Sequence, residues 1–181
     1  MAFKAILAAA ALTLSGCAAH DGRLTQFEAT LAAQDSATAA LGAWCKARAI
    51  ADPAVVTAQP VLGEDAPAPA GLNDLLQTSA APGYRHVRLA CGPAVLSEAH
   101  NWYVPQRLTP EMNAALASSD TPFGRVAAPL RFTRERQAAQ RGRAPGCPRG
   151  TVLSNRAILR LPDGIPLSFV VECYTRANLA D

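Results

Sequence analysis

Residues 85–104 read RHVRLACGPAVLSEAHNWYV and carry the clearest structural signal in the chain. Polar and apolar residues alternate in the first part of this stretch, which predicts a β-strand with Arg85, Val87 and Leu89 on one face. Gly-Pro-Ala then supplies turn residues, and a second extended run starts at Val95. The stretch therefore predicts an antiparallel hairpin.

A second hairpin is expected near the end of the chain. Residues 162–165, Pro-Asp-Gly-Ile, are strong turn formers between two strand-like runs, residues 152–161 and 166–176. Another strand is expected over residues 130–135, followed by a loop over residues 137–150 that is rich in Arg, Gly and Pro. The second half of the chain is therefore predicted to be mostly β.

Helical patterns precede these strands. The expected helices span residues 24–33, 37–50, 72–77 and 109–118, and a short edge strand is expected over residues 55–59. Helices followed by hairpins indicate an α+β domain with an antiparallel sheet. The length suits one compact domain, which we place at residues 24–181.

The first residues of the chain predict export. Lys4 precedes an apolar run that is too short to cross a membrane, as in a signal peptide over residues 1–16. The Leu-Ser-Gly-Cys sequence that ends at Cys17 resembles the lipobox of bacterial lipoproteins. We therefore expect cleavage before Cys17, lipid on its thiol and a lipidated tether over residues 17–23. These features predict an outer-membrane lipoprotein facing the periplasm, and an ordinary signal peptide with an incidental cysteine is the alternative.

The charge balance does not indicate a nucleic-acid partner. The chain has 17 basic and 14 acidic residues, a net charge of +3, and loss of Lys4 with the signal peptide lowers it to +2. Several arginines lie inside apolar segments, where a planar guanidinium is suited to binding carboxylates. We expect a monomer that binds a small anionic ligand.

Four cysteines remain after Cys17. They are Cys45, Cys91, Cys147 and Cys173. An even set in an oxidising compartment predicts up to two disulfides, whereas a metal site usually has close pairs such as C-x-x-C. We expect disulfides and no metal site, with three pairings open. A catalytic cysteine is the weaker alternative, because none lies in a recognisable nucleophile motif.

Several short motifs occur in the order found in the chorismate lyases. Residues 84–92 (YRHVRLACG), followed by LSEA and YVP, are similar to that family's central hairpin. Residues 121–125 (TPFGR) resemble its Thr-Pro-Leu-Gly segment, and Pro-Leu followed by Glu172 resembles its last strand. The resemblance covers residues 84–176. It implies a chorismate-lyase-like sheet with helices packed on one side around a small ligand pocket, and conversion of chorismate to 4-hydroxybenzoate and pyruvate without a metal or organic cofactor.

The resemblance also implies roles for individual residues. Arg85 matches the arginine that binds a ligand carboxylate, and Phe123 matches a leucine that closes the pocket. Glu172 matches the acidic residue beside the reacting ether oxygen and is the candidate catalytic residue. Arg156, on the preceding strand, is a candidate second contact to the anion.

Physical chemistry allows two interpretations of Arg85 and Glu172. A buried charge must be paired, so Arg85 among apolar neighbours needs a carboxylate from a ligand or from the protein. Partial burial of Glu172 would favour the protonated form that a general acid requires. The alternative is an internal ion pair between these two residues, since such networks perturb acids as readily as active sites do.

Other conspicuous residues have a structural and a functional interpretation. Residues 101–103, Asn-Trp-Tyr, could line a pocket for an aromatic ligand, but sheet core is their more frequent role. His100 is expected on the strand surface rather than on a metal. A group of arginines could guide an anion or contact lipid headgroups, although a solvated surface is favoured. These are Arg131, Arg134, Arg136, Arg141, Arg143 and Arg149.

Two departures from the chorismate lyases lead to two function hypotheses. Those enzymes work in the cytoplasm, whereas this chain is expected to be exported, and its segment between Leu167 and Glu172 is one residue longer. The first hypothesis is a lyase-like enzyme acting on chorismate or a related enol-ether or aromatic acid. The second is a non-catalytic lipoprotein that binds a small aromatic carboxylate.

Overall fold

A computed structural model describes the backbone of residues 9–63 and 65–180 and the side chains of residues 20–63 and 65–180. Residues 1–8 of the expected signal peptide and the side chain of Cys17 lie outside the described residues. In the part of the chain that is described, no helix is long and apolar enough to cross a membrane.

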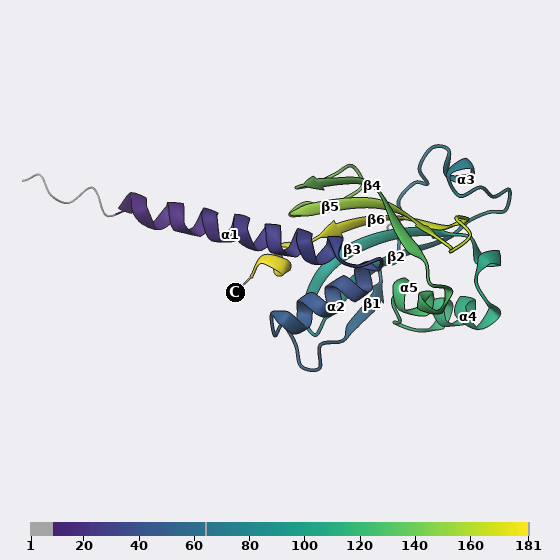
Figure 1. The fold of residues 1–181 in the computed structure, drawn as a ribbon, viewed down its shortest axis with the longest axis horizontal. Coiled ribbons are helices and arrows are strands. Elements are labelled where there is room, and N and C mark those ends of the chain that lie inside the picture. Colours follow the sequence, from purple (N-terminus) through teal and green to yellow (C-terminus); the bar gives the residue numbers. More distant parts are fainter. Residues whose placement is uncertain (1–8, 64, 181) are drawn as a thin grey trace, which may run out of the picture.

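A six-stranded antiparallel sheet forms the centre of the domain (Figure 1). Its strands are β1 Val56–Pro60, β2 Gly83–Cys91, β3 Ala94–Tyr103, β4 Thr133–Arg141, β5 Leu153–Arg160 and β6 Pro166–Tyr174. They lie in the order β1-β2-β3-β6-β5-β4. The predicted α+β class is confirmed, and both expected hairpins form, as β2–β3 and β5–β6.

Three helices form close to the expected positions, at residues 37–47, 72–75 and 110–118, whereas the first begins at Ala9 rather than at residue 24. The helices are α1 Ala9–Ala32, α2 Ala37–Ala47, α3 Leu72–Leu75, α4 Pro110–Ser118 and α5 Phe123–Val126, with 3-10 turns η1 Pro105–Arg107, η2 Ala128–Leu130 and η3 Arg176–Leu179. The side chains of Ser36 and Thr109 cap α2 and α4 by accepting hydrogen bonds from backbone N–H groups of the first turn. Residues 17–23, expected as a tether, continue α1, which projects from the domain (Figure 1).

One face of the sheet, here called the inner face, is covered by helices. Phe27 of α1 packs between Trp44 of α2 and Tyr174 of β6, with ring centroids 5.2 Å apart in both pairs. The disulfide Cys45–Cys91 ties α2 to β2 with a Cα–Cα distance of 6.4 Å. These contacts make the inner face the main hydrophobic core.

The opposite face, here called the outer face, is covered by loops and the single turn α3. Leu72 and Leu76 pack against Trp102 of β3 in a second apolar cluster. The disulfide Cys147–Cys173 ties the β4–β5 loop to β6, with a Cα–Cα distance of 5.4 Å. The four cysteines thus form two disulfides, one on each face of the sheet.

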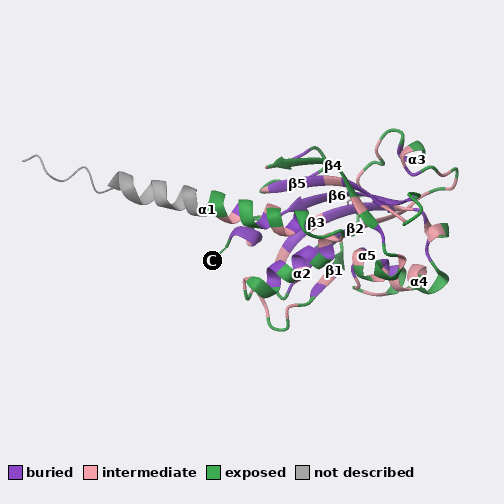
Figure 2. Cartoon of the chain, in the orientation of Figure 1, coloured by how far each residue is buried: buried purple, intermediate pink, exposed green. Residues whose placement is uncertain are grey.

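The position of β4 differs from the expectation. A strand was expected over residues 130–135 and a loop over residues 137–150, but β4 runs over Thr133–Arg141. This strand lies at the edge of the sheet and is largely exposed, in contrast to the buried β6 (Figure 2). An exposed edge strand needs no apolar alternation, and its charged side chains hinder pairing with other sheets. The sequence pattern therefore resembled that of a loop.

Candidate functional site

A small hollow, here called the inner cavity, lies between the inner face and the helices. Its lining includes Thr38, Asn101, Phe123, Arg134 and Glu172. Its volume of about 50 Å³ holds a few water molecules. Typical ligand pockets measure roughly 300–1,000 Å³, so the inner cavity has no room for a drug-sized ligand in this conformation.

Glu172 takes part in a buried ion pair on this cavity. Arg134 donates from both terminal guanidinium nitrogens to the two carboxylate oxygens, with an Nη1–Oε1 distance of 2.8 Å. The Tyr174 hydroxyl donates to Oε2 at 2.7 Å. Burial by itself would lower the pKa of Arg134, but the charge and hydrogen bonds of Glu172 outweigh it and raise that pKa. Burial raises the pKa of Tyr174 well above its usual value.

Arg85 has a different partner. Its Nη1 donates to the carbonyl of Thr121 at 3.3 Å, and partial burial lowers its pKa. Among the described residues, no ion pair joins Arg85 to Glu172, so the internal-pair interpretation is wrong: Arg134 occupies that place. Register explains the difference, because Arg85 lies opposite Asn101, whereas Glu172 belongs to a neighbouring row of the sheet.

The expectation that Arg134 belongs to the solvated surface is also wrong. Its side chain is only 6% exposed, while the other five arginines of that group are exposed residues. Pairing of β4 with β5 places Arg134 opposite Leu159, on the inner face. The sequence gives no separate signal for this pairing, because β4 lacks strand alternation.

Asn101 is an unusual residue of the inner cavity. It is 5% exposed, and neither its side-chain oxygen nor its side-chain nitrogen has a hydrogen-bond partner in the described part of the protein. A buried polar group left without a partner costs about 1–3 kcal/mol. Asn101 therefore marks a point where the cavity can bind water or a small polar group.

A larger hollow, here called the outer cleft, lies on the other face. Its volume is about 360 Å³, within the range of ligand pockets. Trp102 and Phe169 lie along its floor with ring centroids 6.1 Å apart, and residues 66–69 and 145–146 form its walls. Arg156 also lines it and donates to the carbonyl of Pro145 at 3.3 Å.

The structure separates the predicted site residues into two places. Phe123 and Glu172 share the inner cavity, and Arg85 lies nearby without lining it. Arg156 lies opposite Val171 in the β5–β6 ladder, hence on the outer face, and does not meet Glu172. An arginine and a glutamate on neighbouring strands thus point in opposite directions because side chains alternate.

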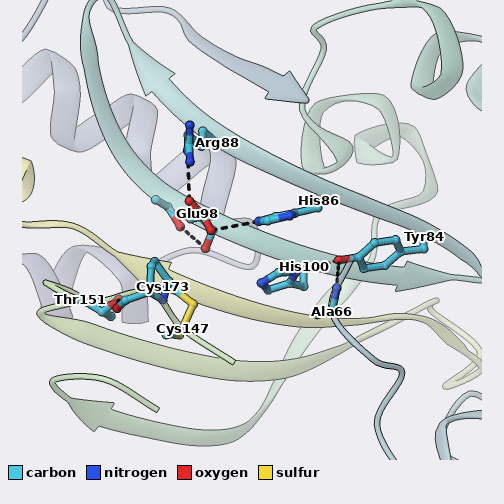
Figure 3. A network of polar contacts seen from close by, with 11 residues as sticks. Ala66, Tyr84, His86, Arg88, Glu98, His100, Cys147, Thr151 and Cys173 are labelled. Atoms are coloured by element: carbon cyan, nitrogen blue, oxygen red, sulfur yellow. Dashed lines mark hydrogen bonds and ion pairs between the residues drawn. A yellow bond between two sulfur atoms is a disulfide. The ribbon is translucent and has the colours of Figure 1, made fainter. Parts of the chain in front are cut away.

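Beside the outer cleft, two histidines and a glutamate form a compact polar cluster (Figure 3). His86 Nε2 lies 3.0 Å from Glu98 Oε1, and the rings of His86 and His100 stack with centroids 4.1 Å apart. His100 Nδ1 lies 2.9 Å from the Tyr84 hydroxyl, which accepts a hydrogen bond from the backbone of Ala66. We call His86, Glu98 and His100 the histidine cluster.

The placement of His100 corrects the expectation of a surface residue. It is 4% exposed, because the chain around Ala66 and the β4–β5 loop close over it. Burial lowers the pKa of His100, and the nearby charge of His86 lowers it further. For Glu98, burial would raise the pKa, but hydrogen bonds from Arg88 and His86 outweigh burial and lower it.

Comparisons with known proteins give one close relative and several distant structures. No family model matches the chain. The solved structures include the ligand-binding domain of a putative GntR-family transcriptional regulator from Bordetella bronchiseptica, at 16% identity and a TM-score of 0.44 over 66% of this chain and 82% of that one. Another is the possible transcriptional regulator YydK from Bacillus subtilis, at 15% identity and a TM-score of 0.44 over 68% and 58% of the two chains. Similarity at this level assigns neither a ligand nor an activity.

A curated protein from Sinorhizobium fredii is much more similar. It is 40% identical over 179 residues, which cover 87% of this chain and 75% of the relative. Identity at this level over most of both chains means that the chain belongs to the family of the Sinorhizobium fredii protein named "Uncharacterized protein y4mC".

Proposed function

We propose that this chain is a lipid-anchored protein that binds a small aromatic carboxylate in the outer cleft. The observation that carries the proposal is the pairing of an aromatic floor, Trp102 and Phe169, with the guanidinium of Arg156 in a hollow of about 360 Å³. Aromatic side chains offer flat contact area to a ring. Arginine binds a carboxylate through two parallel hydrogen bonds.

The contacts of Glu172 and the small volume of the inner cavity argue against pyruvate elimination, which leaves binding as the favoured function. Both oxygens of Glu172 already accept hydrogen bonds from Arg134, and one also accepts from Tyr174. A general acid must face the leaving oxygen of the substrate, whereas both oxygens of Glu172 are already held by donors of the protein. A cavity of about 50 Å³ is also small for a molecule such as chorismate.

The membrane location is part of the proposal and rests on the lipobox-like sequence before Cys17. Cys17→Ser should abolish lipid modification and release or stall the precursor. Metabolic labelling with a radioactive fatty acid measures this directly. Label that persists on the Cys17→Ser chain would contradict lipidation at this cysteine.

Calorimetry with 4-hydroxybenzoate tests the ligand and the site together. Arg156→Gln should weaken binding about 10–100-fold, since a hydrogen bond to a charged group contributes roughly 1.5–3 kcal/mol. Arg149→Gln is the matched control, because it removes the same charge from an exposed position on the neighbouring loop. The control should bind like the parent protein.

Three outcomes would contradict the proposal. The parent chain could fail to bind 4-hydroxybenzoate, or Arg156→Gln could bind it as the parent does. Loss of binding on Asn101→Ala with Arg156→Gln unaffected would place the ligand in the inner cavity instead. Incubation with chorismate separates the two function hypotheses, because pyruvate release would favour the lyase-like enzyme.

A further inference from the structure

We infer that the histidine cluster binds a divalent transition-metal ion through His86, Glu98 and His100. The inference is independent of the proposed aromatic ligand, although His100 also borders the outer cleft. One ligand atom from each of the three residues lies within 4.8 Å of the other two. No such arrangement was expected from the sequence, where only His100 attracted notice.

Strand pairing brings the three residues together. His86 of β2 lies directly opposite His100 of β3, and Glu98 precedes His100 by two positions on the same face of that strand. Residues two apart on a strand share a face, so all three side chains project from the outer face. Figure 3 shows them converging between the two strands. The metal would thus be held by two directly paired strands.

The ligand set has the composition of a three-ligand zinc site. Two imidazoles and one carboxylate occur in zinc centres that keep a fourth position for water or substrate. Bonds of about 2.0–2.1 Å in a tetrahedral site place ligand atoms roughly 3.3 Å apart. Side-chain rotations can close the remaining distance, because the backbone positions are already adjacent.

Neighbouring groups can orient these ligands. Metal-bound histidines usually hydrogen-bond through the second ring nitrogen, which fixes the ring orientation. His100 contacts the Tyr84 hydroxyl through Nδ1 and also has a hydrogen bond with the backbone of Gly146, so a bound metal ion would replace one of these partners and leave the other to orient the ring. The two histidines are 6% and 4% exposed, and their rings stack with centroids 4.1 Å apart, which keeps both rings in place between the strands.

Arg88 would compete with a metal ion for the carboxylate of Glu98. Its removal should therefore change the metal affinity in the opposite direction from removal of a ligand. Its Nε donates to Glu98 Oε2 at 3.1 Å, so a bound cation would compete with this guanidinium for the carboxylate. The Arg88 side chain is 47% exposed and can turn into solvent. Removal of Arg88 should therefore tighten metal binding, whereas removal of a ligand should weaken it.

The experiment is calorimetric titration of the full chain with Zn²⁺ in a Cys17→Ser background, which removes the thiol outside the two disulfides. We expect one Zn²⁺ per chain. His86→Gln should weaken binding by more than about 100-fold, beyond the 10–100-fold effect of losing an outer-shell partner. Glu98→Gln should weaken it at least about tenfold, and Arg88→Gln should strengthen it a few-fold. His20→Gln, which removes a histidine of α1 outside the cluster, should bind like the parent.

A second measurement separates metal loss from unfolding. Co²⁺ in the parent chain should give the intense visible absorption of a tetrahedral site, and circular dichroism should show that His86→Gln remains folded. The inference is overturned if the parent chain binds no Zn²⁺. It is also overturned if folded His86→Gln binds Zn²⁺ like the parent, or if His20→Gln removes the binding.

Discussion

The two faces of the sheet differ in what covers them and in the space that remains. Helices pack on the inner face, where a cavity of about 50 Å³ encloses an ion pair and a second hollow of about 250 Å³ lies between α1 and the strands β4 and β5. Loops cover the outer face and leave a cleft of about 360 Å³ beside the histidine cluster. The proposed binding role belongs to the outer face, and the buried ion pair gives the inner face a structural role.

The largest expected effect concerns the buried ion pair. Arg134→Met leaves the carboxylate of Glu172 buried without its charged partner, which should lower the free energy of unfolding by about 3–5 kcal/mol. Arg136→Met is the matched control, because Arg136 is an exposed arginine two positions along the same strand. It should change stability by less than about 0.5 kcal/mol. Urea unfolding of both variants measures the difference, and equal stability would contradict a structural role for the pair.

The two disulfides provide the next test of the comparison. Chain entropy for separations of 46 and 26 residues predicts losses of about 4 and about 3.5 kcal/mol when each pair is replaced by serine. Ligand binding should distinguish them more clearly than stability. Loss of Cys147–Cys173 frees a wall of the outer cleft and should weaken 4-hydroxybenzoate binding, whereas loss of Cys45–Cys91 should not. Calorimetry at a temperature where both variants are folded checks this, and equal weakening would contradict the separation of roles.

A smaller effect is expected at Asn101. Asn101→Leu removes an amide without partners and keeps a similar volume, so it should raise the free energy of unfolding by about 1 kcal/mol. Asn178→Leu is the contrasting variant. The Asn178 side chain donates to the carbonyl of Leu96 at 2.6 Å, so this replacement should lower the free energy of unfolding. A marked destabilisation by Asn101→Leu would mean that the inner cavity holds a bound partner for this amide.

The smallest expected effect is the pH dependence of the outer face. Burial lowers the pKa of His100 in the folded state, so its contribution to stability is fully present above about pH 6.5 and is lost as the pH falls through the folded-state pKa. One such group changes stability by at most about 1.4 kcal/mol per pH unit. Urea unfolding between pH 7.5 and roughly pH 5 should show this slope reduced in His100→Gln and unchanged in His20→Gln. An unchanged slope in His100→Gln would contradict the assignment.

The hairpins and capped helices could be predicted from the sequence. Alternation around Val87 and turn residues at 162–165 specify local pairing, and Ser36 and Thr109 mark the starts of α2 and α4. Glu172 lies on the same face of β6 as Val170, as the alternation of side chains along a strand requires. These features depend on neighbours in sequence, which is why pattern reasoning found them.

The site could be predicted only in part, because it depends on pairing between distant strands. Arg134 reaches Glu172 only because β4 pairs with β5, and nothing in the polar sequence of β4 specifies that register. His86 and His100 were not recognised as neighbours, although the predicted hairpin placed them on facing strands. Counting the pairs back from the Gly-Pro-Ala turn would have placed His86 opposite Ala99, because a β-bulge between Leu89 and Ala90 shifts the register by one residue.

Helix α1 has a consequence for how the domain would lie at a membrane. If the chain is cleaved before Cys17, the lipid sits on the first residue of a continuous helix that enters the core at Leu24. Seven helical residues span only about 10 Å. The ion pair Asp21–Arg141 and the hydrogen bond from Arg23 to the Leu179 carbonyl brace this segment against the domain. The anchor would then be a short rigid helix rather than a flexible linker. It would hold one side of the protein toward the lipid surface.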